Sequence, residues 1–464
     1  MNADSHTGVL EKEEALSRQL STAQLAMIAI GGAIGTGLFL GSALAVRLAG
    51  PGIILTYVLG AVVALLLMGA LSEMAVAHPT AGSFGVYAEI YVSRWAGFVV
   101  RYTYWACQVI ATGGEATAVA IYCQWWMPQV PQWLWIVGFS AALIYVNARS
   151  VANFGEFEYW FAMIKVVAIV LMILVGAGAL AGLGPAPAIG LGNYTAHGGF
   201  LPMGWKGVWM AIVFVIFGYL GTEVVAVTSG EAKDPRKAVP QAMRSMLGRL
   251  IVFYLGSIVV LIGIVPWNQI QPGADITASP FVKVFQYMGV PAAAHFINFV
   301  VLTAALSSMN CNLYLVTRMI FSLARGGYAP ESLGRVSARG VPRNALLISS
   351  AGLMIATALA MFSSRAFVVL FGVALFGGLF TWLMIFVTHL YFRPKWEAAG
   401  GDALPVRMAG YPYTSILGVL LMVAILATTW WVEGMRITLQ SGLAWMVFIS
   451  LAYLGWKQRQ EREN

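Results

Sequence analysis

Charge is scarce in this sequence. Asp, Glu, Lys and Arg together make up 10% of its 464 residues, against about 25% in soluble globular domains. Hydrophobic residues make up 59%, and apolar stretches of about 20 residues recur along almost the whole length. This composition excludes a soluble globular protein and leaves no room for a separate soluble domain. It predicts an all-α integral membrane protein.

Cysteine is also rare, and its placement argues against a disulfide framework. Cys107, Cys123 and Cys311 all fall in apolar segments. Cys107 and Cys123 are 16 residues apart on one predicted helix, which separates them by about 24 Å. We therefore expect the three thiols to be buried and unreactive, and we expect neither a metal site nor a cofactor.

Apolar runs bounded by glycine, proline and charged residues predict twelve transmembrane helices. The predicted ranges are 22–46, 50–77, 96–124, 131–150, 158–183, 205–230, 246–265, 290–323, 344–362, 366–392, 413–432 and 438–456. Residues 21–456 then form one domain, flanked by polar tails at 1–20 and 457–464. The first tail lacks the basic start and short apolar core of a signal peptide.

Basic residues are divided unequally between the predicted connections. If the N-terminus is cytoplasmic, the internal connections hold most of them, including Lys233, Arg236, Arg335 and Arg393. This positive-inside bias predicts that both termini lie in the cytoplasm. It also explains the net charge of +8, so the partner that this charge indicates is the lipid bilayer and not nucleic acid.

Two similar glycine motifs lie in the first and sixth predicted helices. Residues 32–37 read GAIGTG and residues 218–223 read GYLGTE. Since the first motif opens a group of five helices and the second opens the next group, the second begins from the opposite side of the membrane. The pattern predicts an inverted repeat of five plus five helices with two more appended.

The two glycine motifs predict interruptions in helices one and six. Glycine is unfavourable inside a helix, and a cluster of glycines at membrane depth is typical of unwound backbone that binds a transported solute. The alternative is that small residues only let helices pack closely. Glu223 directly follows the second motif and favours a binding site, because a carboxylate at this depth is costly without a function.

Four ionisable residues are predicted to lie at membrane depth: Glu73, Glu115, Lys165 and Glu223. We expect the other charged residues to reach an interface. Glu73 is close to a helix end, which favours a structural role. For the other three we expect proton coupling, with a hydrogen-bonded structural role as the alternative.

Lys165 is the most informative of the four. A lysine in a dry site can release its proton whereas an arginine stays charged, so Lys165 can carry a proton. No cluster of carboxylates and hydroxyls is suited to sodium, although backbone carbonyls remain an alternative sodium site.

Four long motifs carry a family resemblance. They are residues 30–39, residues 155–165, residues 221–240 and the pieces at 318–323, 329–330 and 339–342. With these motifs in this order, from about residue 20 to about residue 456, the chain resembles bacterial amino acid permeases. They belong to the amino acid transporter family of the amino acid-polyamine-organocation superfamily.

The resemblance implies the leucine-transporter fold, with repeats at about 21–183 and 205–392 and the last two helices at about 413–456. It implies import of an α-amino acid across the bacterial inner membrane by alternating access, driven by the proton gradient. In related transporters the substrate carboxylate meets backbone amides, which here are those of Gly35, Thr36 and Gly37. The ammonium group meets carbonyls at both interruptions, and Lys165 takes the place of a bound cation.

The full set of predicted binding residues combines these backbone positions with side chains around them. It comprises Ala33, Ile34, Gly35, Thr36, Gly37, Phe217, Gly218, Tyr219, Leu220, Cys107 and Asn310. Gln108 and Phe376 are expected near the substrate side chain. Because these groups are uncharged, we expect a substrate with a neutral side chain.

Three alternatives stay open for the substrate and the transport mode: a cationic amino acid, γ-aminobutyrate, or exchange of one amino acid for another. A membrane-embedded enzyme needs a nucleophile or a metal set at depth, yet His78, His197, His295 and His389 fall in different spans or loops. A channel needs a filter repeated around a pore axis. We therefore expect a transporter and not an enzyme.

Overall fold

The computed structural model describes residues 18–39, 41–149, 151–183, 187–270, 280–287, 293–362 and 366–463. These residues form helices, and among them the one β-bridge pairs Leu20 with Ala232. The all-α prediction is confirmed. The α-helices are α2 (Thr22–Ala33), α3 (Thr36–Phe39), α4 (Gly41–Ala49), α5 (Ile53–Ala77), α6 (Ser83–Tyr91), α7 (Arg94–Gln124), α8 (Gln132–Arg149), α9 (Val151–Ala181), α10 (Gly204–Tyr219), α11 (Val224–Thr228), α12 (Pro235–Ile264), α13 (Pro280–Tyr287), α14 (Ala293–Arg325), α15 (Arg343–Phe362), α16 (Ala366–Ala398), α17 (Tyr413–Thr428) and α18 (Arg436–Glu463).

Several of these helices begin at capping residues that the sequence displays. Ser21 and Gln24 form a reciprocal capping box at the start of α2, which satisfies two backbone donors that the first turn leaves free. Asp234 caps α12, whose first residue is Pro235, and Ser93 caps α7. Capping side chains therefore fix where these helices begin, and the apolar residues that follow form their interiors.

Seven helical stretches within the described residues are long and apolar enough to cross a membrane, judged by length and composition. Each of the twelve ranges predicted from sequence contains helical residues. Some of these helices, such as α8 and α17, do not reach that length or hydropathy. The finding supports several crossings, and the count of twelve stays a prediction.

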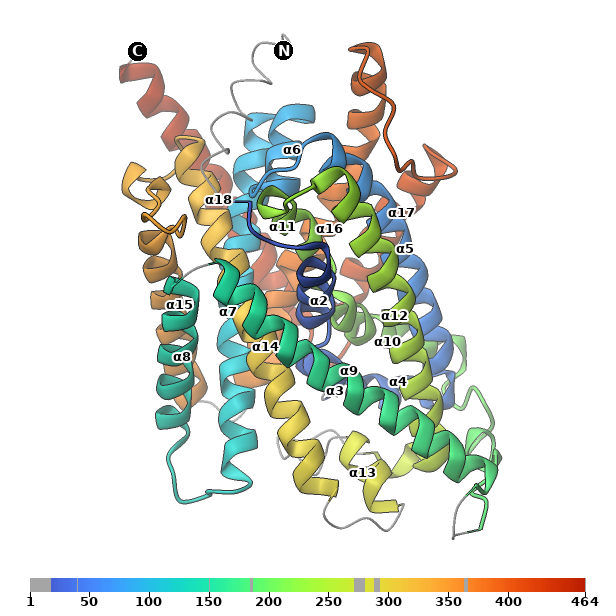
Figure 1. Cartoon of the computed structure of the whole chain (residues 1–464). Coiled ribbons are helices and arrows are strands. Elements are labelled where there is room, and N and C mark those ends of the chain that lie inside the picture. The colour runs from blue at the N-terminus through green and yellow to red at the C-terminus, as the bar shows by residue number, and fades with distance from the viewer. Residues whose placement is uncertain are drawn as a thin grey trace.

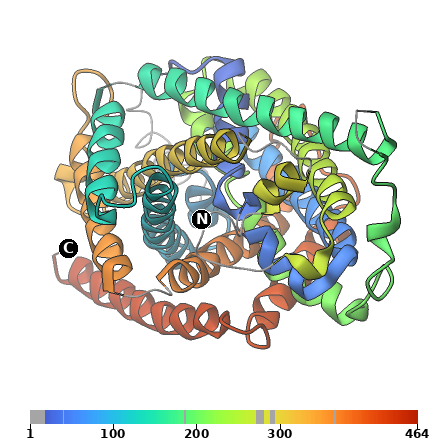
Figure 2. The ribbon, with the colours of Figure 1, turned by 90° about the horizontal axis from the view of Figure 1, so that it is seen from below.

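The two interrupted helices lie inside the bundle. Figure 1 shows α2 and α10 at its centre, with α9 crossing obliquely in front, and Figure 2 shows α9 and α18 along opposite edges. The long helices α7 and α14 pack against each other, and α16 also packs against α7. Segments far apart in sequence therefore surround the interruptions.

Both helices are interrupted at the glycine motifs, as the sequence predicts. The first helix stops at Ala33 and resumes at Thr36, and the second stops at Tyr219 and resumes at Val224. α2 packs against α11 while α4 packs against α10, so the first part of each contacts the second part of the other. The two helices therefore run antiparallel, which is what an inverted repeat requires.

Gly221 is the residue that permits this close crossing. Its φ is +97°, a conformation that side-chain-bearing residues rarely adopt. A β-carbon there would collide with the carbonyl group of Gly32. The second glycine motif is thus needed both for its own turn and for its contact with the first.

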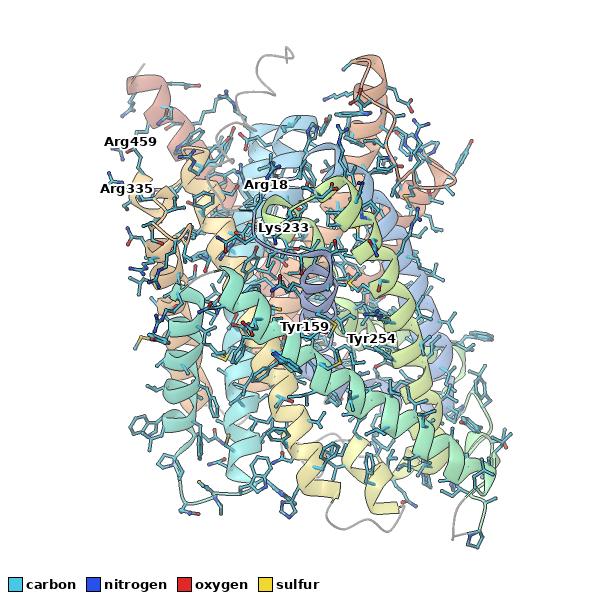
Figure 3. All side chains as sticks on the ribbon, in the orientation of Figure 1. Arg18, Tyr159, Lys233, Tyr254, Arg335 and Arg459 are labelled. Atoms are coloured by element: carbon cyan, nitrogen blue, oxygen red, sulfur yellow. The ribbon has the colours of Figure 1, made fainter. Side chains whose placement is uncertain are left out.

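Basic residues gather at one end of the bundle. Figure 3 shows Arg18, Lys233, Arg335 and Arg459 there, with Tyr159 and Tyr254 nearer its middle. Lys233 and Arg335 belong to connections that were predicted on the same side. The arrangement agrees with that prediction, while the identity of the compartment stays a prediction.

The expectation that other charged residues reach an interface was wrong for five of them. Glu89, Arg101, Glu158, Glu231 and Arg318 are buried. Four of them form two ion pairs, Glu89 with Arg101 and Glu231 with Arg318. The sequence placed them near helix ends, but neighbouring helices cover those ends.

Glu73 has the structural role that was expected. Its carboxylate is buried and accepts hydrogen bonds from Arg393, from the Met408 backbone and from His389 Nε2, the last at 2.8 Å. It joins α5 to α16 and to the segment before α17.

We predict that replacing Arg101 destabilises the fold far more than replacing an exposed arginine. Arg101 pairs with Glu89 and donates to Ser322 Oγ at 2.9 Å. Arg101→Met leaves Glu89 as a buried unpaired charge, at a cost of about 3–5 kcal/mol. In Arg407→Met the lost pair with Glu397 is exposed, which is worth about 0–1 kcal/mol. Thermal unfolding of both variants in detergent measures the difference, and equal losses would contradict the burial argument.

Candidate functional site

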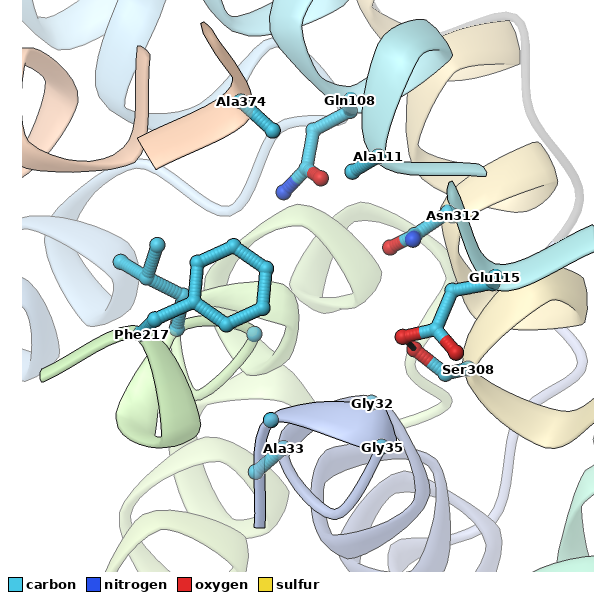
Figure 4. A pocket seen from close by; sticks show the side chains of 13 residues that line it. Gly32, Ala33, Gly35, Gln108, Ala111, Glu115, Phe217, Ser308, Asn312 and Ala374 are labelled. Carbon is cyan, nitrogen blue, oxygen red and sulfur yellow. Dashed lines mark hydrogen bonds between the residues drawn. The ribbon is translucent and has the colours of Figure 1, made fainter. Parts of the chain in front are cut away.

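A small cavity lies where the two interrupted helices meet (Figure 4). The volume of this cavity is about 40 Å³. The lining comes from both interrupted helices and from α7, α14 and α16, and comprises Gly32, Ala33, Gly35, Gly37, Gln108, Ala111, Glu115, Phe217, Leu220, Gly221, Ser308, Asn312 and Ala374. In Figure 4 Phe217 lies on one side, and Glu115 with Ser308 on the other.

Lys165 supports the carbonyl end of the first interruption. Its side chain is fully buried on α9, and Nζ donates to the carbonyls of Gly31 and Ile34, both at 2.7 Å. These carbonyls need a donor from outside their own helix, because the helix stops at Ala33. A charged donor forms stronger hydrogen bonds than a neutral one. The amine therefore satisfies both carbonyls and holds the backbone at the break in place.

Glu115 occupies the amide end of the same interruption. Its Oε1 accepts from Thr36 Oγ1 at 3.1 Å and from Ser308 Oγ at 3.0 Å. Among the described residues, Oε2 is buried and has no hydrogen-bond partner. Glu115 lines the cavity, so this unpaired oxygen is the group that a solute or a proton would meet.

Tyr254 joins the two interruptions, and it was not among the predicted site residues. Its hydroxyl lies 2.8 Å from the Ala33 carbonyl and 2.6 Å from the Gly218 carbonyl. A phenol has one proton to donate, so the two carbonyls share it. These carbonyls were predicted to meet an ammonium group, which would have to bind beside the Tyr254 hydroxyl.

Glu223 closes the second interruption without lining the cavity. Its carboxylate accepts from the Gly221 N–H at 3.0 Å, from the Tyr104 hydroxyl at 2.8 Å and from Trp382 Nε1 at 3.1 Å. Tyr104 is on α7 and Trp382 is on α16, so Glu223 connects the second interruption to both of these helices.

The cavity contains part of the predicted binding set. Ala33, Gly35, Gly37, Phe217, Leu220 and Gln108 line it. The predicted residues that do not line it are Ile34, Thr36, Gly218, Tyr219, Cys107, Asn310 and Phe376.

Two of the residues outside the cavity have clear alternative partners. The Tyr219 hydroxyl donates to the Tyr57 carbonyl at 3.1 Å. Asn310 accepts from Asn147 at 2.7 Å and donates to Glu158 at 3.0 Å. Both side chains therefore support neighbouring helices in this conformation.

Helical spacing explains which lining residues were missed. Ser308 and Asn312 are four residues apart and share one face of α14, while Asn310 between them points elsewhere. Gln108, Ala111 and Glu115 likewise share one face of α7. This spacing is present in the sequence, but it identifies the lining residues only when the inward face of each helix is known.

The chain matches the family model described as amino acid permease over residues 24–461. It is 37% identical over 448 residues to the Bacillus subtilis protein named uncharacterized amino acid permease YtnA, covering 96% of each chain. It is 38% identical to the γ-aminobutyric acid permease of the same organism, covering 98% of this chain and 96% of the relative. A third relative, the Salmonella typhimurium aromatic amino acid transport protein AroP, is 38% identical over 95% of this chain and 96% of its own.

We predict that Gly35→Val weakens amino acid binding at least tenfold, about 1.4 kcal/mol. A β-carbon at Gly35 would lie 2.8 Å from Ser308 Oγ and 2.9 Å from Glu115 Oε1, so a branched side chain fills the cavity and displaces Glu115. Gly138→Val is the control, because nothing lies within 4 Å of a β-carbon there. Calorimetric titration of both folded variants measures the effect, and unchanged affinity in Gly35→Val would contradict the assignment of the site.

Proposed function

Because the chain belongs to the amino acid permease family, we propose that it is a proton-coupled symporter that imports an α-amino acid with a neutral side chain. The proposal includes twelve membrane-spanning helices in the leucine-transporter fold and a location in the bacterial inner membrane with both termini cytoplasmic. It also includes alternating access around the cavity between the interrupted helices. The family supports amino acid transport itself, and the side chains at the cavity support the finer statements.

The charges of an α-amino acid match the backbone groups of the two interruptions. Helix starts present amides that favour anions, and helix ends present carbonyls that favour cations. Gly35 and Gly37 are on the amide side of the cavity, and Gly32 and Leu220 are on its carbonyl side. A zwitterion offers one charge to each.

The observation that carries proton coupling is the Glu115 carboxylate, which lines the cavity beside Gly35 and whose Oε2 has no hydrogen-bond partner among the described residues. An amino acid whose carboxylate reaches Gly35 stands next to the Glu115 carboxylate. Two like charges in a site with little water repel strongly. Protonating Glu115 removes that repulsion, so substrate and proton bind together more favourably than either does alone.

Uncharged lining residues favour a neutral substrate side chain. Beyond Glu115, the groups around the cavity are apolar or carry neutral amides and hydroxyls, among them Phe217, Gln108 and Asn312. The second candidate is γ-aminobutyrate or a cationic amino acid. Glu115 favours it, because its carboxylate can pair with the side-chain ammonium group of a cationic amino acid or with the distal ammonium group of γ-aminobutyrate.

Uptake into proteoliposomes with an imposed pH gradient tests the proposal. We expect saturable accumulation of a labelled neutral amino acid that scales with an inside-alkaline gradient and needs no sodium. Competition by a panel of amino acids and γ-aminobutyrate identifies the substrate. Accumulation that depends on sodium, or that occurs only in exchange for internal amino acid, would contradict proton symport.

We predict that Lys165→Ala abolishes accumulation driven by the pH gradient and keeps amino acid binding within about tenfold. Lys165 binds carbonyls of the interruption and does not line the cavity. Its replacement therefore removes the proposed proton carrier but none of the groups that contact the substrate. The exposed Lys206→Ala is the control and should transport normally. Concentrative uptake by Lys165→Ala at the wild-type level would exclude Lys165 from coupling.

A further inference from the structure

Glu158 is a buried carboxylate that the proposed mechanism does not use. It lies on α9 with no exposed surface, seven residues before Lys165. Seven residues are about two turns, so both side chains lie on the same face of the helix. This face packs against α2 and α14.

Neutral hydrogen bonds fix the Glu158 carboxylate. Oε1 accepts from Ser307 Oγ, and Oε2 accepts from Asn310 Nδ2 at 3.0 Å. Asn310 in turn accepts from Asn147 of α8 at 2.7 Å. These donors are suited to an ionised carboxylate, but they supply no positive charge to balance it.

Gly31 connects Glu158 to Lys165. A β-carbon on Gly31 would collide with the Glu158 carboxylate, which therefore packs directly on this glycine. The carbonyl of the same residue accepts from Lys165 Nζ at 2.7 Å. The two ionisable groups thus contact one residue of the first interrupted helix.

The surroundings leave Lys165 as the cation that balances Glu158. The amine is the basic group that acts electrostatically on Glu158. The groups that act electrostatically on the buried Lys165 amine are the Glu158 carboxylate, the Cys311 thiol of α14 and the Glu115 carboxylate of α7. From α12 the facing group is the Tyr254 hydroxyl, which binds the Ala33 carbonyl. A buried carboxylate without a balancing charge is strongly disfavoured.

We propose that Glu158 is the buried counter-charge that sets the external pH at which Lys165 takes up its proton. This inference rests on the proposed proton coupling. The proton enters from water, binds the Lys165 amine and later leaves to the other side, while Glu158 stays ionised. Glu158 is a positioning residue, because it acts through Lys165 and touches no substrate.

Glu158→Gln keeps the shape of the side chain and one of its two acceptor oxygens, and it removes the charge. Without the counter-charge, the protonated amine is less stable, so more acid is needed to load it. We expect half-maximal uptake to move to lower external pH by about one to two units. The maximal rate at acidic pH and the exchange of labelled for unlabelled amino acid should stay close to wild type.

Two further variants make the test specific. Glu156→Gln is the same substitution at an exposed position of the same helix, and it should leave the pH profile unchanged. Asn310→Ala removes one hydrogen bond from the ionised Glu158, which favours the protonated form of this carboxylate and so weakens the counter-charge. It should therefore move the profile in the same direction by a smaller amount. It also provides the test if Glu158→Gln does not fold.

The profiles separate this inference from the proposed function. If wild type accumulates amino acid with the pH gradient and Glu158→Gln loses rate equally at every pH, Glu158 is only structural and the inference is overturned. An unshifted profile in Asn310→Ala would overturn it in the same way if Glu158→Gln cannot be purified. If wild type itself shows no gradient-driven accumulation, the proposed function fails first, whatever the variants do.

Discussion

Backbone groups that an interrupted helix leaves free cannot stay unpaired where water is scarce, and this requirement organises the centre of the molecule. Each interruption frees amides on one side and carbonyls on the other. Lys165 and Tyr254 donate to the carbonyls, Glu223 accepts from the Gly221 amide, and Glu115 accepts from the Thr36 hydroxyl. Three side chains from the surrounding helices α7, α9 and α12, together with Glu223 of the second interruption itself, therefore fix the shape of the two breaks.

Under the proposed function, the same arrangement would link solute binding to protonation. A ligand with a carboxylate and an ammonium group has to share the backbone groups that ionisable side chains already contact. Glu115 is the clearest case, since it lines the cavity with one oxygen unpaired. A change in the charge of such a residue alters both its hold on the backbone and its repulsion of the ligand. In the proposed mechanism, coupling at Glu115 follows from these shared contacts.

The sequence predicted the membrane-spanning character, the two interruptions and the ionisable residues beside them. These features depend on local composition, because glycine clusters and intramembrane charges stand out against an apolar background. Tyr254, Glu158 and the face of α14 with Ser308 and Asn312 were missed. Many of these helices are apolar on all sides, so periodicity does not reveal which face turns inward. Only the packing of distant helices brings Tyr254 to both carbonyls and covers Glu158.

The central claim is that the unwound backbone between Ala33 and Gly37 binds the substrate carboxylate, and a structure with bound amino acid tests it most directly. The amino acid chosen is the one that competes best for uptake. The account predicts its carboxylate within hydrogen-bond distance of the Gly35 or Gly37 N–H, with Glu115 beside it. An amino acid bound elsewhere, or bound here with its carboxylate away from both glycines, would contradict the account.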